Sequence, residues 1–478
     1  MKNIDLAVVG SGIGGSLISA LNIDKKTILF EKDKNLGGCA STFKRFGNYY
    51  NTGATTFVGY EEGHILKKQF DKIGLKPNIS KSDIAIRVIQ NKKTLDRVKN
   101  FEQFLDNINN IYPNKNNKLF WLKIKTIDEK FWKLQKIFYG KFSLSNYIKI
   151  ASFIAELIKT FKFDILKSAD GFIKEILGDI SKEYQNFIDS QLLITIQTNS
   201  KDISILSLAL GLSYPFHNVF YANGGMGSLI EDIVRKVEIK AKQEIAKIIQ
   251  DNENWIVQSV NDEYKTKQLV LNSSIYQSSS LFEDEKIKKY YNSFSFSDQS
   301  AFVIYLTIDT ANINKKFLEH YQFIYNEALP NSISNSFFVS FSKENDQKLS
   351  KNQTLSVTIS THTKANYWKT LSVLEYDNQK EKTQNYIIEK FLEYFTEIKR
   401  YNIKNSFSAT SFTFNRYINR YNCGGKAIGF KNMTQLPSGN TPFKGLFNVG
   451  DTVFAGQGWP GVALGVDVLQ RMLLNESS

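Results

Sequence analysis

Cysteine, proline and histidine are all scarce in this chain of 478 residues. The two cysteines, Cys39 and Cys423, lie near opposite ends of the sequence, so neither a zinc-ligand spacing nor a CxxC redox pair is present, and we expect a reducing compartment and no metal. Seven prolines and 42% hydrophobic residues exclude a collagen-like or disordered chain. The length predicts at least two folded units.

Arginine is also rare, because only 8 of the 61 basic residues are arginine and the rest are lysine. Arginine is the residue that reads base edges and grips phosphate with two hydrogen bonds, so the net charge of +14 does not indicate a nucleic-acid partner. The positive charge is concentrated between Pro113 and Lys167, a segment that contains 12 lysines and 4 acidic residues.

A secretory leader and a long apolar run are both missing. Asp5 interrupts the first apolar segment and a glycine-rich turn begins at Gly10, unlike a signal peptide. The longest stretch without charge, 203–230, contains Pro215 and several glycines, so it does not predict a spanning helix. We expect a protein that begins at Met1 and lies in the cytoplasm or on a membrane surface.

The strongest motif is at the N terminus. Residues 4–9 predict a buried strand, Gly-Ser-Gly-Ile-Gly-Gly follows at 10–15, and helical spacing resumes over 17–21. A second strand, 27–30, ends in Glu31. Strand, glycine turn, helix and a following acid at this spacing form the dinucleotide-binding fingerprint.

Each residue of this fingerprint has an expected role. Gly10 permits the turn, Gly12 lets a pyrophosphate approach the backbone, and Gly15 lets the helix pack on the strand. Glu31 accepts hydrogen bonds from the adenosine ribose and repels a 2′-phosphate. The candidate cofactor-binding residues here are Gly10, Gly12, Gly14, Gly15, Glu31 and Lys32.

A second glycine turn distinguishes FAD from NAD. Gly-Gly-Cys-Ala-Ser-Thr-Phe at 37–43 follows Glu31 closely, and Asn-Thr-Gly-Ala occupies 51–54. At this point NAD dehydrogenases usually begin another helix, whereas a turn directed back at the cofactor is typical of FAD enzymes. Gly37, Gly38, Gly53 and Ala54 are therefore further candidates for cofactor binding.

The C-terminal region carries a second motif that fits the same cofactor. A predicted strand, 445–449, ends in Gly450 and Asp451, and a glycine-rich turn leads into a helix over 462–474. The positive end of this helix would face the flavin pyrimidine edge, and Asp451 would accept from ribityl hydroxyls. The candidate binding residues are Gly450, Asp451, Gly458, Gly461 and Val462.

Six stretches together resemble the carotenoid desaturases and carotenoid isomerases of the flavin amine-oxidase superfamily. They are GSGIGG, FEKDKNLGGCASTFKRFG, NTGATTFVGYEEGHI, YANGGMGSLIEDI, LVLNSS and GLFNVGDTVFAGQGWPGVALGV, in that order. The resemblance implies FAD, an apolar substrate tunnel and hydride transfer from a carotenoid or other polyprenoid to the flavin. It also implies that Ile245 touches the adenine through its backbone.

The resemblance implies an α/β fold: a Rossmann-like FAD-binding domain of the glutathione-reductase type with an inserted α+β substrate domain. We expect the FAD domain at 1–75, 216–280 and 405–478, and the substrate domain at 76–215 and 281–404. Alternation of apolar residues predicts strands at 244–248, 269–271, 302–306 and 354–358.

The basic region contains a predicted amphipathic helix over 147–163. Ile150, Phe153, Leu157 and Phe161 recur at helical spacing, lysines border them, and Trp121, Phe131, Trp132, Phe138, Tyr139 and Phe142 precede them. Residues 113–167 therefore predict peripheral contact with the cytoplasmic face of an anionic membrane, from which a polyprenoid is collected. A core helix with solvated lysines is the alternative.

No acid–base or nucleophile motif accompanies the four histidines His64, His217, His320 and His362, which we interpret as structural, so the catalytic residues stay unassigned. Trp459 and Pro460 are candidate walls of the substrate site, although Trp459 also suits a core. Cys39 stands where many superfamily members carry an arginine after the glycine pair. The pyrophosphate contact that this arginine makes in them is therefore less readily expected in this chain.

Three other functions remain open on this scaffold: saturation or cis–trans isomerisation of a polyene, amine oxidation, and lipid carriage without flavin chemistry. The sequence has no second nucleotide fingerprint, so it gives no evidence of a dedicated NAD(P)H domain. Whether oxygen or a quinone reoxidises the flavin is left open.

Overall fold

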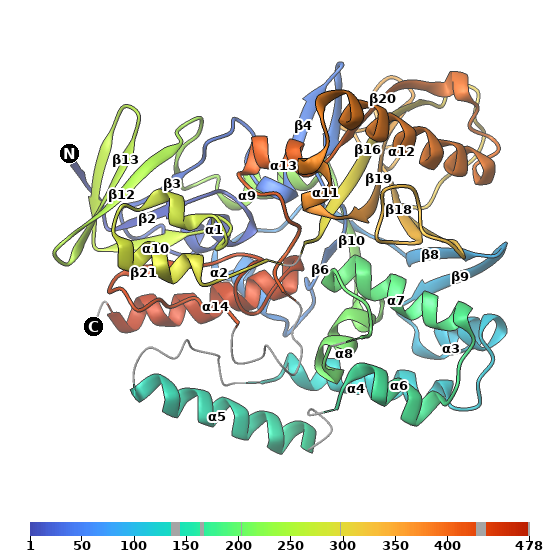
Figure 1. Ribbon diagram of the computed structural model, residues 1–478, viewed down its shortest axis with the longest axis horizontal. Coiled ribbons are helices and arrows are strands. Elements are labelled where there is room, and N and C mark those ends of the chain that lie inside the picture. The colour runs from blue at the N-terminus through green and yellow to red at the C-terminus, as the bar shows by residue number, and fades with distance from the viewer. Residues whose placement is uncertain (135–143, 163–166, 202, 297, 427–435, 477–478) are drawn as a thin grey trace.

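A five-stranded parallel sheet lies in the half of the molecule that holds both termini (Figure 1). The computed structural model describes residues 1–134, 144–162, 167–201, 203–296, 298–426 and 436–476. The sheet order is β11 (Glu238–Lys240), β3 (Thr27–Phe30), β2 (Leu6–Val9), β15 (Gln268–Leu271) and β21 (Leu446–Asn448). Except for the edge strand β11, its strands are mainly apolar and almost wholly buried because helices and a second sheet cover both faces.

The two faces of this sheet have different covers. On one face α1 (Ile13–Ala20), α9 (Met226–Ile233) and α14 (Gly458–Glu476) share an apolar core. On the other lie α10 (Glu285–Asn292) and a four-stranded sheet of β1 (Lys2–Asn3), β14 (Glu263–Thr266), β13 (Asn254–Ser259) and β12 (Ile245–Asp251). This is the Rossmann-like arrangement that the fingerprint predicted.

A seven-stranded sheet dominates the other half. Its order is β20 (Ile403–Ala409), β16 (Ser300–Asp309), β19 (Thr354–Thr363), β18 (Ser336–Phe341), β17 (His320–Ile324), β8 (Ile84–Gln90) and β9 (Lys93–Val98). All neighbours are antiparallel except β17 and β8. Helix α12 (Val373–Tyr394) packs on this sheet.

A helical layer completes this half. It comprises α3 (Phe101–Ile111), α4 (Asn117–Phe131), α6 (Ala169–Leu177), α7 (Lys182–Ile196) and α8 (Ile205–Ser213) around one core. Helix α5 (Leu144–Phe161) runs along the lower edge of the molecule (Figure 1).

Short elements connect the two halves. Three groups of elements lie between them. They are the hairpin of β4 (Thr42–Arg45) and β5 (Asn48–Asn51), the small sheet of β6 (Phe57–Val58), β10 (Val219–Ala222) and β7 (Ile79–Lys81), and the helices α2 (Ile65–Lys72), α11 (Ala365–Thr370) and α13 (Ser411–Ile418). Single turns of 3-10 helix occur at η1 (Gly38–Ala40), η3 (Tyr214–Phe216), η4 (Ser278–Leu281) and η5 (Arg400–Asn402).

The four strands predicted by alternation are present as parts of β12, β15, β16 and β19, and the C-terminal helix begins at Gly458, four residues before its predicted start. The division into two domains stays a proposal. Two of its boundaries do not follow the packing. Most of β20 was placed in the FAD domain, but β20 pairs with β16 in the seven-stranded sheet, and α10 was placed in the substrate domain, but it packs on the five-stranded sheet.

Candidate active site

The N-terminal glycine turn, residues 10–15, joins β2 to α1. Gly10 adopts a φ of +100°, and a Cβ on Gly15 would lie 2.0 Å from the Gly10 carbonyl oxygen, so the turn requires glycine at both places. Gly12 is the N-cap of α1 and offers no side chain to its first N–H groups. Those groups and the positive helix end are available to an anionic ligand.

Asn272 was missed at the sequence level. It follows β15, and its Nδ2 donates to the Gly10 carbonyl at 3.2 Å. A Cβ on Gly12, Gly14 or Gly450 would lie 2.7–2.9 Å from its amide atoms, so three predicted glycines surround this side chain. Its position at the carboxyl end of a parallel strand, within the LVLNSS stretch, is the signal that points to it.

Glu31 and the second glycine turn meet the first turn. The Glu31 carboxylate accepts from Ser11 N at 2.9 Å and from Ser11 Oγ at 2.6 Å, and Ser11 Oγ accepts from Gly37 N at 3.0 Å. A Cβ on Gly38 would lie 3.9 Å from the Gly12 Cα. Two motifs predicted to face one cofactor are therefore adjacent.

Gly53 and Ala54 join the same group from the next loop. Ala54 N donates to the Cys39 carbonyl at 3.0 Å, and a Cβ on Gly53 would lie 3.6 Å from that oxygen. Lys32 lies further out, where its Nζ donates to the Arg416 carbonyl at 3.3 Å. Ile245 is buried in β12. It lies near Glu31, since Gln243, two residues before it, donates its backbone N–H to the Glu31 carbonyl at 2.9 Å.

The C-terminal glycine turn, residues 450–461, lies beside these loops. Gly450 adopts a φ of +117°, and a Cβ on Gly14 would lie 3.1 Å from its nitrogen. Gly458 begins α14, Gly461 packs on the Gly456 carbonyl, and Val462 is buried. The two chain ends that the sequence assigned to one cofactor thus share one site.

Trp459 and Pro460 differ in their surroundings. Trp459 is only 2% exposed and packs edge-on against Phe57, with ring centroids 4.9 Å apart, which favours a core position over a substrate wall. Pro460 is partly exposed and packs against Gly59.

Arg420 is a second residue that the sequence did not reveal. Its Nη1 donates to both oxygens of Asp451 at 3.0 Å, and its Nε donates to the Asn422 carbonyl at 2.9 Å. Burial alone would lower the pKa of Arg420, but the Asp451 carboxylate raises it, so the guanidinium is charged. Asp451, predicted to meet ribityl hydroxyls, is therefore held in an ion pair.

The remaining nitrogen, Arg420 Nη2, is buried without a hydrogen-bond partner among the described residues. An unpaired charged donor beside three glycine turns is what an anionic cofactor would satisfy. Its charge also acts on Cys39 in the second glycine turn, so a guanidinium from a segment distant in sequence lies near that turn.

Both cysteines lie near this ion pair. Burial raises the pKa of Cys39, and burial followed by the charge of Cys39 raises the pKa of Cys423 to about 12. Both thiols are free, and both are affected by the Arg420–Asp451 pair although they stand far apart in the sequence.

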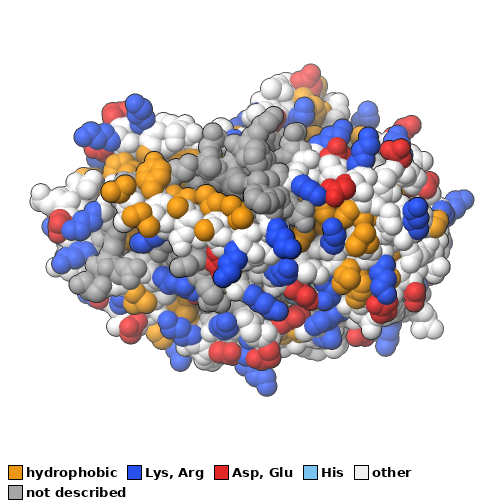
Figure 2. Space-filling view, turned by 90° about the horizontal axis from the view of Figure 1, so that it is seen from below, with side chains coloured by type: hydrophobic (Ala, Val, Ile, Leu, Met, Phe, Trp, Pro, Cys, Tyr) orange, Lys and Arg blue, Asp and Glu red, His pale blue; other side chains and the backbone are white. Residues whose placement is uncertain are grey.

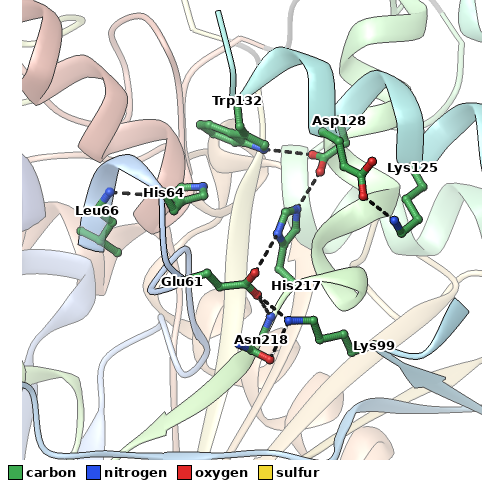
Figure 3. A network of polar contacts seen from close by, with 10 residues as sticks. Glu61, His64, Leu66, Lys99, Lys125, Asp128, Trp132, His217 and Asn218 are labelled. Atoms are coloured by element: carbon green, nitrogen blue, oxygen red, sulfur yellow. Dashed lines mark hydrogen bonds and ion pairs between the residues drawn. The ribbon is translucent and has the colours of Figure 1, made fainter. Parts of the chain in front are cut away.

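A second charged cluster joins the loop before α2, helix α4 and the segment after η3 (Figure 3). His217 Nε2 donates to Asp128 Oδ2 at 2.6 Å, and its Nδ1 lies 3.9 Å from Glu61 Oε2. Lys99 Nζ donates to Glu61 at 3.3 Å, and Trp132 Nε1 donates to Asp128 at 3.0 Å. We call Glu61, Lys99, Asp128 and His217 the histidine cluster.

The charges in this cluster support one another. Burial alone would lower the pKa of His217, but hydrogen bonding to Asp128 and Glu61 raises it to about 9. Burial alone would raise the pKa of Glu61, but His217 and the Asn218 N–H lower it to about 2. His217 is therefore a cation between two carboxylates at neutral pH.

The fold brings two of the four histidines together. The ring centroids of His64 and His217 are 6.2 Å apart, and His64 lies 4.7 Å from the Trp132 ring. These residues come from the loop before α2, the segment after η3 and the end of α4, so no spacing in the sequence announces them. His320 is separate, buried between Ser340 and Thr56.

Comparison with known proteins assigns the family. The sequence model of the flavin containing amine oxidoreductases matches residues 19–456. The chain belongs to this family. It is an FAD-dependent oxidoreductase, and the glycine turns, Asn272 and Arg420 are the residues present that fit FAD.

Individual relatives are distant. Prolycopene isomerase of Daucus carota is 21% identical over 97% of this chain and 78% of its own length, and the inactive all-trans-retinol 13,14-reductase of Danio rerio is 24% identical over 49% and 40%. An oxidoreductase of Methanosarcina mazei has a TM-score of 0.62 at 17% identity, covering 98% of this chain and 100% of that one. Putrescine oxidase bound to putrescine has a TM-score of 0.64 at 12% identity, covering 99% and 98%, and these structures support the fold.

Proposed function

We propose that this enzyme acts on a carotenoid or another polyprenoid lipid, and that it desaturates this substrate. The observation that carries the proposal is an apolar cluster between α5 and the C-terminal glycine turn. We call this the α5 cluster: Phe131, Phe153, Leu157, Phe161 and Leu206. The similarity to prolycopene isomerase, which spans 97% of this chain and 78% of that protein, supports a polyene substrate for this chain.

The α5 cluster reaches the flavin side of the molecule. Phe153 on α5 and Phe454 in the C-terminal glycine turn have ring centroids 6.2 Å apart, and Leu464 on α14 packs on the same cluster. Each of its five members keeps between 5 and 8% exposure, whereas many residues of the other cores keep none. This loosely closed apolar region suits passage of an apolar chain toward the flavin.

The outer face of α5 is apolar as well. Leu144, Tyr147, Ile148, Ile154 and Ile158 are exposed, the first by 80%, and Figure 2 shows a row of hydrophobic side chains on this lower face, with lysines nearby. Such a surface supports peripheral contact with an anionic membrane. No helix in the described ranges is long and apolar enough to span a membrane. Phe138, Tyr139 and Phe142, also predicted to contribute, lie outside the described residues.

The protein's own residues have separable tasks in this proposal. The glycine turns and Arg420 hold the cofactor, Glu31 holds its ribose, and the α5 cluster excludes water from the hydrocarbon. FAD, when bound, supplies a two-electron acceptor for hydrogen leaving a saturated carbon pair. Running in the opposite direction, the same site would saturate a double bond.

An anaerobic absorbance titration tests the proposal. Adding a partly saturated polyprenoid such as phytoene to the oxidised holoenzyme should bleach the flavin band and yield a product with one more conjugated double bond. If the band is unchanged and the product is a cis–trans isomer, desaturation is wrong. If putrescine bleaches the flavin and the lipid does not, amine oxidation replaces the proposal.

A further inference from the structure

His64 lies where the C-terminal glycine turn meets the α5 cluster. A Cβ on Gly59 would lie 3.0 Å from Pro460 Cγ and 3.1 Å from His64 Cε1, so both rings pack on this glycine. On the other side, the His64 ring faces Trp132, whose indole packs on the α5 cluster. His64 is therefore a polar residue at the border of the proposed path of the substrate.

One nitrogen of His64 is already used. Nδ1 accepts from Leu66 N at 3.5 Å at the start of α2, so the proton of the neutral ring is on Nε2. Although the side chain is only 9% exposed, Nε2 has no partner among the residues that the structure describes. Nε2 is not among the fully buried unpaired atoms, so water can reach it, and an oxygen of a bound ligand would replace that water.

The neighbouring groups keep His64 neutral. Burial, followed by the positive charges of His217 and Lys68, lowers the pKa of His64 to about 4, and Glu61 opposes this only partly. His217 keeps its charge because it is bound by Asp128 and Glu61. The charge on His217 thus helps to keep the His64 ring neutral at physiological pH, where it remains a hydrogen-bond donor.

The histidine cluster itself offers less to a ligand. The Asp128 oxygens accept from His217 and Trp132, and Glu61 accepts from Lys99 and the Asn218 N–H (Figure 3). Its two carboxylates are balanced by His217 and Lys99, so the cluster leaves no net charge with which an anionic ligand could pair, and burying an unpaired carboxylate is costly. The free donor of His64 therefore suits a neutral oxygen.

We propose that His64 donates a hydrogen bond from Nε2 to a hydroxyl or carbonyl oxygen at the end of the polyene. This inference rests on the proposed function and narrows its substrate class, from any polyprenoid to one that carries a neutral oxygen. The oxygen would lie beside Trp132 and Pro460, with the hydrocarbon extending along the α5 cluster.

Paired probes test the assignment. We would titrate the holoenzyme with all-trans-retinol, with the same polyene lacking the hydroxyl, and with retinoic acid, following tryptophan fluorescence. Wild type should bind the alcohol about three- to tenfold more tightly than the hydrocarbon, as one neutral hydrogen bond allows, and the acid no better than the hydrocarbon. His64→Phe should abolish the preference, and His64→Gln, whose amide N–H replaces Nε2–H, should restore part of it.

The outcomes separate the two proposals. If wild type binds alcohol and hydrocarbon equally, or if His64→Phe keeps the preference, the role of His64 is wrong while the polyprenoid function stands. If no polyene binds wild type, both fail. Should His64→Phe not fold, NMR of ¹⁵N-histidine wild type decides: the His64 Nε2–H signal should shift with retinol and not with the hydrocarbon, and equal shifts would overturn the proposal.

Discussion

Two charged clusters, the Arg420–Asp451 pair and the histidine cluster, differ in how completely they are paired. Arg420 binds Asp451 but keeps Nη2 without a partner among the described residues. In the histidine cluster, His217 is held between Asp128 and Glu61. The open pair is suited to a ligand, whereas the paired cluster stabilises the fold and sets the charge around His64.

The largest effect is expected from breaking the paired cluster. Asp128→Ala removes the closest partner of His217 and leaves a half-buried imidazolium with Glu61 alone, which should lower the free energy of unfolding by about 2–3 kcal/mol. Urea denaturation measures the loss. Asp128→Asn, which keeps an acceptor of similar shape, should cost less. Equal stability of Asp128→Ala and wild type would show that the cluster does not stabilise the fold.

The same cluster predicts a pH dependence. His217 has a pKa of about 9, raised above its ordinary value of 6.5, so its stabilisation is complete below pH 6.5 and is lost as the pH rises through 9. The shift corresponds to about 3 kcal/mol. His64, with a pKa lowered to about 4, contributes stability that is lost as the pH falls from 6.5 toward 4. Stability measured against pH should therefore be greatest near 6.5, and His217→Gln should remove the decline between pH 6.5 and 9.

Breaking the Arg420–Asp451 pair should mainly weaken the binding of the cofactor. Arg420→Met removes a charge-assisted donor, so the affinity of apoprotein for FAD should fall about 10- to 100-fold. Lys99→Met, which removes a cation from the paired cluster, is the matched control and should leave FAD affinity unchanged. Fluorescence titration with FAD gives both values. An unchanged affinity in Arg420→Met would exclude Arg420 from the cofactor site.

The smallest effect on stability is expected outside both clusters, on α5. Ile148 and Ile154 are 67% and 42% exposed, so replacing both by serine should change the free energy of unfolding by less than about 0.5 kcal/mol. Binding to anionic vesicles at low salt should nevertheless weaken several-fold. Val260→Ser, at a site 85% exposed on the hairpin of β13 and β14, is the control. Equal sedimentation of the two variants with vesicles would refute the membrane contact.

The sequence by itself determined the FAD half of the molecule. The N-terminal glycine turn, Glu31 and the C-terminal glycine turn follow from local requirements: a positive φ, a close approach of backbones, or an acid at the end of a strand. Such requirements restrict the amino acid at a single position, so they can be recognised in one chain. Four strands of the five-stranded sheet, β3, β2, β15 and β21, were predictable because burial on both faces makes them mainly apolar, whereas the edge strand β11 was not predicted.

Only the tertiary structure decided which polar residues meet. Arg420 reaches Asp451 from the segment after α13, Asn272 reaches Gly10 from the end of β15, and His64, Asp128 and His217 come from three elements. Asn272 has a sequence signal in its place at the end of a predicted strand, but the others need neither a special backbone nor a fixed spacing, so each looks like an ordinary surface or core residue in the sequence. Their chemistry arises from distance and burial, which pair charges, leave single donors free and move pKa values, and these exist only once the chain has folded.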